Sequence, residues 1–99
     1  MAQFDVCRLR DSEELLLDCQ SDILDRLETR FVVPLLSPDD MPKRIAKLNP
    51  RFEIDGKEFV MATQGAATIP AKMIGSCVTS LADAHHEIVG ALDMLISGY

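Results

Sequence analysis

The sequence predicts a mainly β domain, a small barrel or sandwich, that ends in an apolar C-terminal helix. Its 99 residues are the length of one domain with one modest core. Short extended segments separated by turn residues fill the middle of the chain, which is typical of small barrels and sandwiches. Hydrophobic residues make up 47% and charged residues 26%, a composition that argues against disorder. We therefore expect residues 1–99 to form a single domain.

The first extended segment is QFDVC, residues 3–7, whose alternating apolar and polar side chains predict a half-buried strand. Residues 11–30 fit two structures. Ser12 is suited to cap a helix, and an extended LLLDC followed by a turn at QSD is the alternative. The helical interpretation rests on apolar side chains that fall on one side of a helix, at Leu16, Cys19, Ile23, Leu24 and Leu27. The pattern alone leaves both structures open.

Residues 30–36, RFVVPLL, form a β-branched apolar run that predicts another strand. Pro34 limits this strand to an edge or a bulge, because proline has no N–H to donate to a neighbouring strand. Residues 37–50 begin and end with turn residues and predict a loop with one helical turn around residues 43–48. Residues 52–63 are the clearest local signal, because Asp55-Gly56 between two β-rich runs suits a tight hairpin. Residues 66–75 continue as an extended segment interrupted at Pro70.

The last segment, residues 80–96, has a helical pattern about 25 Å long. Ser80 is placed to cap its N-terminus, and Asp83 lies near the positive end of the dipole. The apolar stripe comprises Leu81, Ala84, Ile88, Leu92 and Leu95. Further apolar side chains widen it beyond one face. We expect one face of the helix to pack on the sheet and its tip to stay exposed.

Charge and cysteine content narrow the classes of function. The formal net charge of -6 argues against a nucleic-acid-binding surface and favours a partner with a basic face. Three cysteines without metal-ligand spacing disfavour a disulfide scaffold and favour a reducing cytoplasm, with Cys77 expected to be a buried thiol. The chain opens with no signal-peptide pattern and has no apolar run long enough to span a membrane. We expect a cytoplasmic protein without a membrane partner.

No stretch of the sequence has the pattern of a catalytic, metal or cofactor site. The glycines are scattered and form no phosphate-binding loop. His85 and His86 point about 100° apart on a helix and cannot easily share one metal ion. Acidic residues between Asp11 and Glu28 are spread over many positions, as on a solvated surface. We therefore expect a non-enzymatic protein with no cofactor and no metal.

Several segments occur in a familiar order. QFDV (residues 3–6), LDCQSDIL (17–24), RFVVPL (30–35) and MATQGAATIP (61–70) precede a helix ending ALDMLISGY. With this arrangement the chain resembles the CcdB family, the toxin component of toxin–antitoxin pairs. The resemblance implies an SH3-like small β-barrel of the CcdB/MazF/Kid type with a C-terminal α-helix, assembled as a homodimer. It also implies that LLLDCQ is strand and SDILDRLETR a turn region.

The resemblance further implies a toxin that binds the DNA gyrase A subunit and traps the cleaved DNA complex. A CcdA-type antitoxin would neutralise it, and the two together would repress their operon, so that operator DNA is contacted only through the complex. The implied gyrase-binding residues are Ile23, Leu24, Asp93, Ile96, Ser97, Gly98 and Tyr99. The best-known family member has tryptophan where this chain has Ser97, and we expect that contact to be weaker because aromatic anchors dominate interfaces. The terminal residue of that member is aliphatic where this chain has Tyr99, and its Asn-like contact corresponds to Asp93.

The antitoxin contacts are expected in the loops at residues 8–14 and 39–47, where an acidic strip would attract basic residues. Two other functions remain open. An endoribonuclease of the MazF/Kid type would share the barrel but needs a basic groove, which the acidic charge disfavours. A diverged, non-toxic homologue would keep the fold without engaging gyrase.

Overall fold

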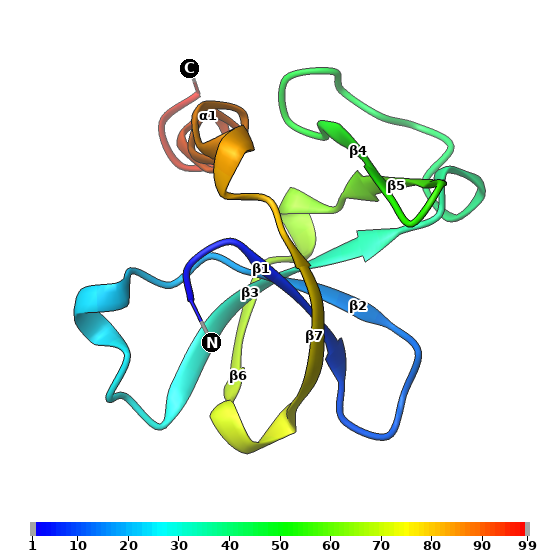
Figure 1. Ribbon diagram of the computed structural model, residues 1–99. Coiled ribbons are helices and arrows are strands. Elements are labelled where there is room, and N and C mark those ends of the chain that lie inside the picture. Colours follow the sequence, from blue (N-terminus) through cyan, green and yellow to red (C-terminus); the bar gives the residue numbers. More distant parts are fainter. Residues whose placement is uncertain (1, 99) are drawn as a thin grey trace.

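The computed structural model describes residues 2–98, and its sheet, shown in Figure 1, is seven-stranded and strongly curled. The strands run antiparallel in the order β4-β5-β3-β2-β1-β7, and β6 pairs with β3 beside β5. Their bounds are β1 Asp5–Leu9, β2 Leu15–Asp18, β3 Thr29–Leu36, β4 Arg51–Ile54, β5 Lys57–Met61, β6 Ala67–Pro70 and β7 Ile74–Ser80. The α-helix α1 (His85–Ser97) follows β7. The predicted mainly β class with a C-terminal helix is confirmed.

The core lies between the concave side of the sheet and α1. Leu17 of β2 and Val33 of β3 are fully buried, and so are Ile88 and Ala91 of α1. The last two lie three residues apart, on one face of the helix, and this face packs on the core cluster. The predicted apolar stripe is therefore correct in its middle, although Leu95 near the end is 44% exposed. One face of α1 is held by the sheet and the opposite face is left free.

Residues 11–30 form a strand and a turn, as the family resemblance implied, and the helical pattern was a false signal. β2 lies between β1 and β3, and all its side chains are buried. A strand covered on both faces has a continuous apolar run and loses the two-residue period that distinguishes it from a helix. After β2, the chain makes a single 3₁₀ turn, η1 (Asp22–Leu24), before it enters β3.

Pro34 was predicted to restrict its strand to an edge or a bulge, and the edge alternative is wrong because β3 pairs on both sides. On one side it runs along β2, with Pro34 opposite Leu16. On the other side β6 pairs with residues up to Val32, and β5 pairs from Leu35 onward. Pro34 lies between these two partners, where its carbonyl accepts from the N–H of Ala62 at 2.9 Å. The missing N–H is tolerated because the neighbouring strand changes at this position.

The loop and the hairpin follow their predictions. The hairpin joins β4 to β5, with left-handed φ angles of 52° at Asp55 and 78° at Gly56. The long loop contains one i→i+4 bond, from the Asn49 N–H to the Ile45 carbonyl at 2.7 Å. It also opens with a 3₁₀ turn, η2 (Pro38–Asp40), capped by Ser37, which the sequence analysis did not predict.

The predicted start of the C-terminal helix is wrong. Ser80 is the last residue of β7, and its hydroxyl accepts from the Ala82 N–H at 3.2 Å, ahead of the α-helix; the 3₁₀ turn η5 (Ala82–Ala84) lies between them and has no side-chain cap. α1 begins at His85 without a side-chain cap. β1 pairs with β2 on one side, and on its other side β7 supplies the hydrogen-bonding partner up to Ser80. Sheet pairing therefore overrides the capping signal.

The cysteine predictions are also corrected. Cys7 of β1 and Cys77 of β7 face each other across the strand pair and form a disulfide. Cys77 is therefore neither a free thiol nor buried. Cys19 is the free buried cysteine of the described residues, and burial, together with the nearby Asp18 carboxylate, raises its pKa to about 12. Such a thiol is protonated and unreactive at neutral pH.

Candidate functional site

The exposed end of α1 carries most of the predicted site. Asp93, Ile96 and Ser97 lie three and four residues apart, so they share one face of the helix. Ile96 is 81% exposed, and the Ser97 hydroxyl donates to the Asp93 carbonyl at 2.7 Å. Gly98 ends the helix in the left-handed conformation, with φ of 82°, and its N–H donates to the Met94 carbonyl at 3.0 Å. The helix therefore ends at Gly98, and its last turn carries the exposed apolar side chain of Ile96.

Tyr99, the last of the predicted contact residues, lies outside the described residues. Leu95, by contrast, was not predicted as a contact although it is 44% exposed beside Ile96. The sequence analysis assigned Leu95 to the buried stripe. Its exposure arises because the sheet does not reach the last turn of α1.

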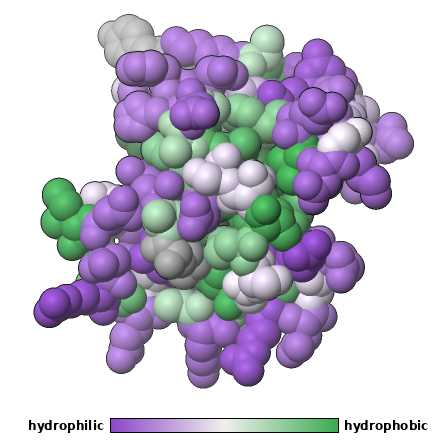
Figure 2. Space-filling model, viewed as in Figure 1, coloured by the Kyte–Doolittle hydropathy of each residue, from purple (hydrophilic) through white to green (hydrophobic). Residues whose placement is uncertain are grey.

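A second apolar cluster lies on the loop that follows β2. Ile23 is 90% exposed, Leu24 49% and Leu27 50%. Figure 2 shows an apolar protrusion at the left edge of the molecule, at the place where Figure 1 draws η1. Ile23 and Leu24 were predicted as contacts, whereas Leu27 was missed because it fitted the false helical pattern. We call Ile23, Leu24 and Leu27 the loop tip.

In Figure 1, the loop that carries the loop tip lies at the left of the molecule and α1 lies at the top. They belong to separate elements, since α1 follows β7 and the loop joins β2 to β3. Both combine strongly exposed isoleucine with a short, hydrogen-bonded backbone. Exposed, preformed apolar groups of this kind are typical of protein-binding surfaces.

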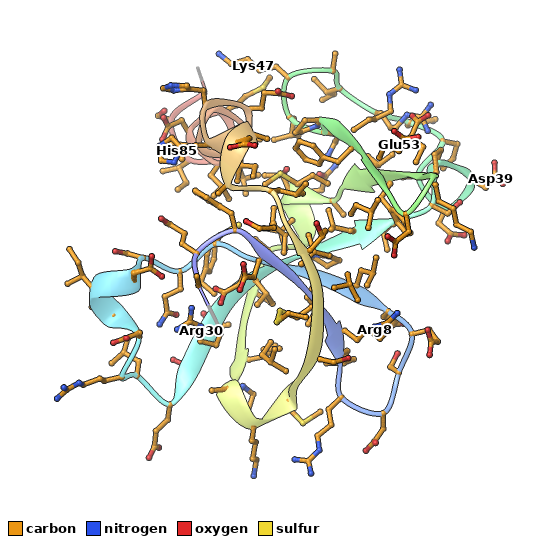
Figure 3. The ribbon with its side chains drawn as sticks, in the orientation of Figure 1. Arg8, Arg30, Asp39, Lys47, Glu53 and His85 are labelled. Carbon is orange, nitrogen blue, oxygen red and sulfur yellow. A yellow bond between two sulfur atoms is a disulfide. The ribbon has the colours of Figure 1, made fainter. Side chains whose placement is uncertain are left out.

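A groove on another part of the molecule is lined by the β1–β2 hairpin and the end of β3. It has a volume of about 640 Å³. Its floor is apolar, with Leu16, Pro34 and Leu36, and acidic residues Glu13 and Glu14 line it. Figure 3 shows Arg8 on the hairpin that borders it, where the guanidinium pairs with Glu13 at 3.4 Å. The sequence analysis predicted this hairpin as a partner contact but not the groove, which requires β3 to lie beside it.

The described residues carry few features of a chemical site. Between Ala2 and Gly98, no cluster of three or more His, Cys, Asp or Glu side chains is placed to hold a metal ion. His85 and His86 are T-shaped neighbours with ring centroids 5.4 Å apart. No helix of this part of the chain is long and apolar enough to cross a membrane.

Comparison with known proteins agrees with this architecture. A family model described as CcdB protein matches residues 3–98. Among solved structures, the chain is similar to an endoribonuclease in complex with its cognate antitoxin from a mycobacterial species. That likeness has a TM-score of 0.75 at 13% sequence identity and covers 97% of this chain and 94% of that chain. At this identity the likeness shows a shared fold.

Proposed function

This chain belongs to the CcdB family, and from that premise we propose that it is the toxin of a type II toxin–antitoxin system that poisons DNA gyrase. In this proposal the loop tip and the end of α1 bind the gyrase A subunit and trap the gyrase–DNA cleavage complex. The observation that carries the proposal is the exposure of Ile23 and Ile96, at 90% and 81%.

Those two side chains give the proposal an energetic basis. Burying an isoleucine side chain contributes about 1.5–3 kcal/mol. The loop and the helix end are already hydrogen-bonded, so little conformational entropy is lost when a partner covers them. A few such anchors supply most of the affinity of a protein interface. The toxin would thus act by binding, without catalytic residues or a cofactor of its own.

We also propose that the active form is a homodimer. A twofold assembly doubles each apolar cluster and matches a symmetric enzyme target. A domain of this size also gains stability from a second subunit. Sedimentation equilibrium would show a mass twice that of the chain, and a monomer at micromolar concentration would contradict this part of the proposal.

The acid-lined groove is our proposed contact for a CcdA-type antitoxin. Its apolar floor and its glutamates, Glu13 and Glu14, suit a segment that combines apolar and basic side chains. Operator DNA would be bound through the antitoxin, because the net charge of -6 disfavours direct contact with phosphates. Charge reversal of Glu13 and Glu14 to lysine should weaken antitoxin binding and leave gyrase binding unchanged.

The proposal is tested with purified gyrase and supercoiled plasmid. We expect double-strand breaks that require both gyrase and this protein. Ile23→Arg and Ile96→Arg should each reduce gyrase binding at least 30-fold, which corresponds to about 2 kcal/mol. Ile45→Arg is the matched control, because Ile45 is also an exposed isoleucine (53%) but lies on the loop between β3 and β4.

Two other results would each identify a different function. RNA cleavage in the absence of gyrase would indicate an endoribonuclease, the activity named for the structural neighbour. The absence of both DNA breaks and RNA cleavage would indicate a diverged homologue that has lost its target.

Removal of Ser97, Gly98 and Tyr99 should also weaken gyrase binding while the dimer survives.

A further inference from the structure

The loop tip presents apolar side chains to water, and the backbone bonds of its loop differ in length. The Leu24 N–H donates to the Ser21 carbonyl at 2.9 Å, whereas the Leu27 N–H reaches the Leu24 carbonyl at 3.3 Å, which is long for a hydrogen bond. Burial of the exposed apolar side chains against the protein surface would be favourable. Bonds between the loop and the rest of the chain therefore help to hold the loop tip outward. One runs from the Gln3 N–H to Asp22 Oδ1 at 2.8 Å, and another connects the loop to β3.

The carboxamide of Gln20 makes that connection. Its Nε2 donates to the Leu24 carbonyl at 2.7 Å, and its Oε1 accepts from the Phe31 N–H of β3 at 2.9 Å. A carbonyl on one side and an N–H on the other allow only one orientation of the amide. The side chain is 7% exposed, so water competes little for these bonds. Gln20 therefore ties the exposed turn to the first half of β3.

The backbone of Gln20 is in turn held by a buried ion pair. Its backbone N–H donates to Asp18 Oδ1 at 3.1 Å. The other carboxylate oxygen of Asp18 accepts from Arg30, at 3.1 Å from Nε and 2.5 Å from Nη2. Asp18 and Arg30 are both buried, and Figure 3 shows Arg30 at the inner end of the loop. A continuous chain of bonds thus runs from the buried ion pair through Gln20 to Leu24.

We propose that Gln20 is a positioning residue that holds Ile23 and Leu24 in the conformation that the partner recognises. The proposal rests on the proposed function, since that partner is the gyrase A subunit. Gln20 does not need to touch the partner, because its side chain is buried and both polar ends are already bonded within the chain. It contributes to affinity by removing the entropy cost of ordering the loop tip on binding.

The test uses Gln20→Met, which keeps the length of the side chain and removes both hydrogen bonds. Gln64→Met is the matched control, because Gln64 also accepts a side-chain bond, from Asn49 Nδ2 at 2.7 Å, but lies in η3 (Thr63–Gly65). Binding to the isolated gyrase A subunit is measured by calorimetry. We expect at least a tenfold loss for Gln20→Met and less than a twofold change for Gln64→Met.

A double-mutant comparison separates positioning from a general structural role. In the background Ile23→Ala/Leu24→Ala, Gln20→Met should change the remaining affinity less than twofold, because the groups that it positions are absent. An equal loss in both backgrounds would overturn the proposal. Unchanged binding by Gln20→Met in the intact background would do so as well.

Amide hydrogen exchange tests the positioning role without any partner. Exchange at Leu24 and Leu27 should accelerate at least tenfold in Gln20→Met, while the amides of Val33 and Leu35 in β3 keep their wild-type rates. Faster exchange throughout the sheet would show a structural role only and overturn the proposal. If Gln20→Met does not fold, Gln20→Glu keeps an acceptor for Phe31 and replaces the donor to Leu24 by a carboxylate oxygen that repels the Leu24 carbonyl, and the same results are expected. If the wild-type protein fails to bind gyrase, the proposed function fails, and the exchange rates still decide whether Gln20 orders the loop.

Discussion

Breaking the buried ion pair between Asp18 and Arg30 should be among the most damaging single changes in this protein. The side chains are 1% and 3% exposed, and they are joined by N–H···O bonds of 3.1 and 2.5 Å. Arg30→Met keeps the bulk of the stem and leaves the Asp18 carboxylate buried, with the Gln20 N–H as its remaining donor. An uncompensated buried charge costs about 3–5 kcal/mol. Domains of this kind are stable by only about 5–15 kcal/mol. We therefore expect the variant to lose a large part of its free energy of unfolding.

The assay is urea unfolding followed by circular dichroism at one fixed protein concentration, since a dimer's apparent stability depends on concentration. Arg51→Met is the matched control, because Arg51 and Glu58 form a pair of 2.9 Å whose side chains are 57% and 50% exposed. Its loss should stay below about 1 kcal/mol.

A double variant, Asp18→Leu/Arg30→Met, removes both charges and should recover most of the stability lost by Arg30→Met alone. The reasoning would be refuted if Arg30→Met cost no more than the exposed control. It would also be refuted if the double variant were no more stable than Arg30→Met, since the cost would then not come from an unpaired charge.

Three further changes test separate features of the fold by the same unfolding assay. Cys7→Ala/Cys77→Ala should lower the free energy of unfolding by up to about 4 kcal/mol, because the disulfide joins positions 70 residues apart; wild-type protein whose midpoint is unmoved by a thiol reductant would contradict this. A Cβ added at Gly56 or at Gly90 would meet no atom within 4 Å, so the backbone conformation decides the effect of alanine at both sites. Gly56→Ala should destabilise by about 1–2 kcal/mol because of its φ of +78°, whereas Gly90→Ala in α1 should stabilise by about 0.5–1 kcal/mol. Effects of the same sign would contradict this reasoning. The Cys19 thiol has a pKa of about 12 in the folded chain against 9.0 for the free group, so the unfolded state releases its proton first and stability falls as pH rises through that interval. Cys19→Ala should show a shallower decline between pH 9 and 12, and parallel curves would exclude this origin.

Local signals in the sequence identified the parts whose structure depends on a few neighbouring residues. Asp55-Gly56 predicted the hairpin because its two left-handed φ angles are inexpensive for these residue types. The apolar end of α1 was predicted to be exposed, and Ile96 is 81% exposed. Ile23 and Leu24 were assigned through the family resemblance, not through the pattern. The pattern placed them on a helix.

The wrong predictions share one physical cause: at each of these positions, contacts between residues distant in the sequence decide the structure. β2 has no alternating pattern because all four of its residues are buried in the folded chain. Pro34 is accepted inside the sheet because β5 and β6 change over at that position. Cys7 and Cys77 form a disulfide because β7 pairs with β1 across most of the chain.

The sequence by itself determined the mainly β class, the tight hairpin and the apolar C-terminal helix, because turn residues and periodicity act over a few residues. Only the tertiary structure decided which apolar side chains stay in water and how they are held. Leu27 and Leu95 have the same character as the core leucines and differ from them only in where the sheet ends. The bond from Gln20 to Leu24 connects the loop to the sheet only because Gln20 is also bonded to Phe31 of β3, which follows the loop in the sequence. A side chain's burial is set by the elements that pack around it, and these come from the whole length of the chain.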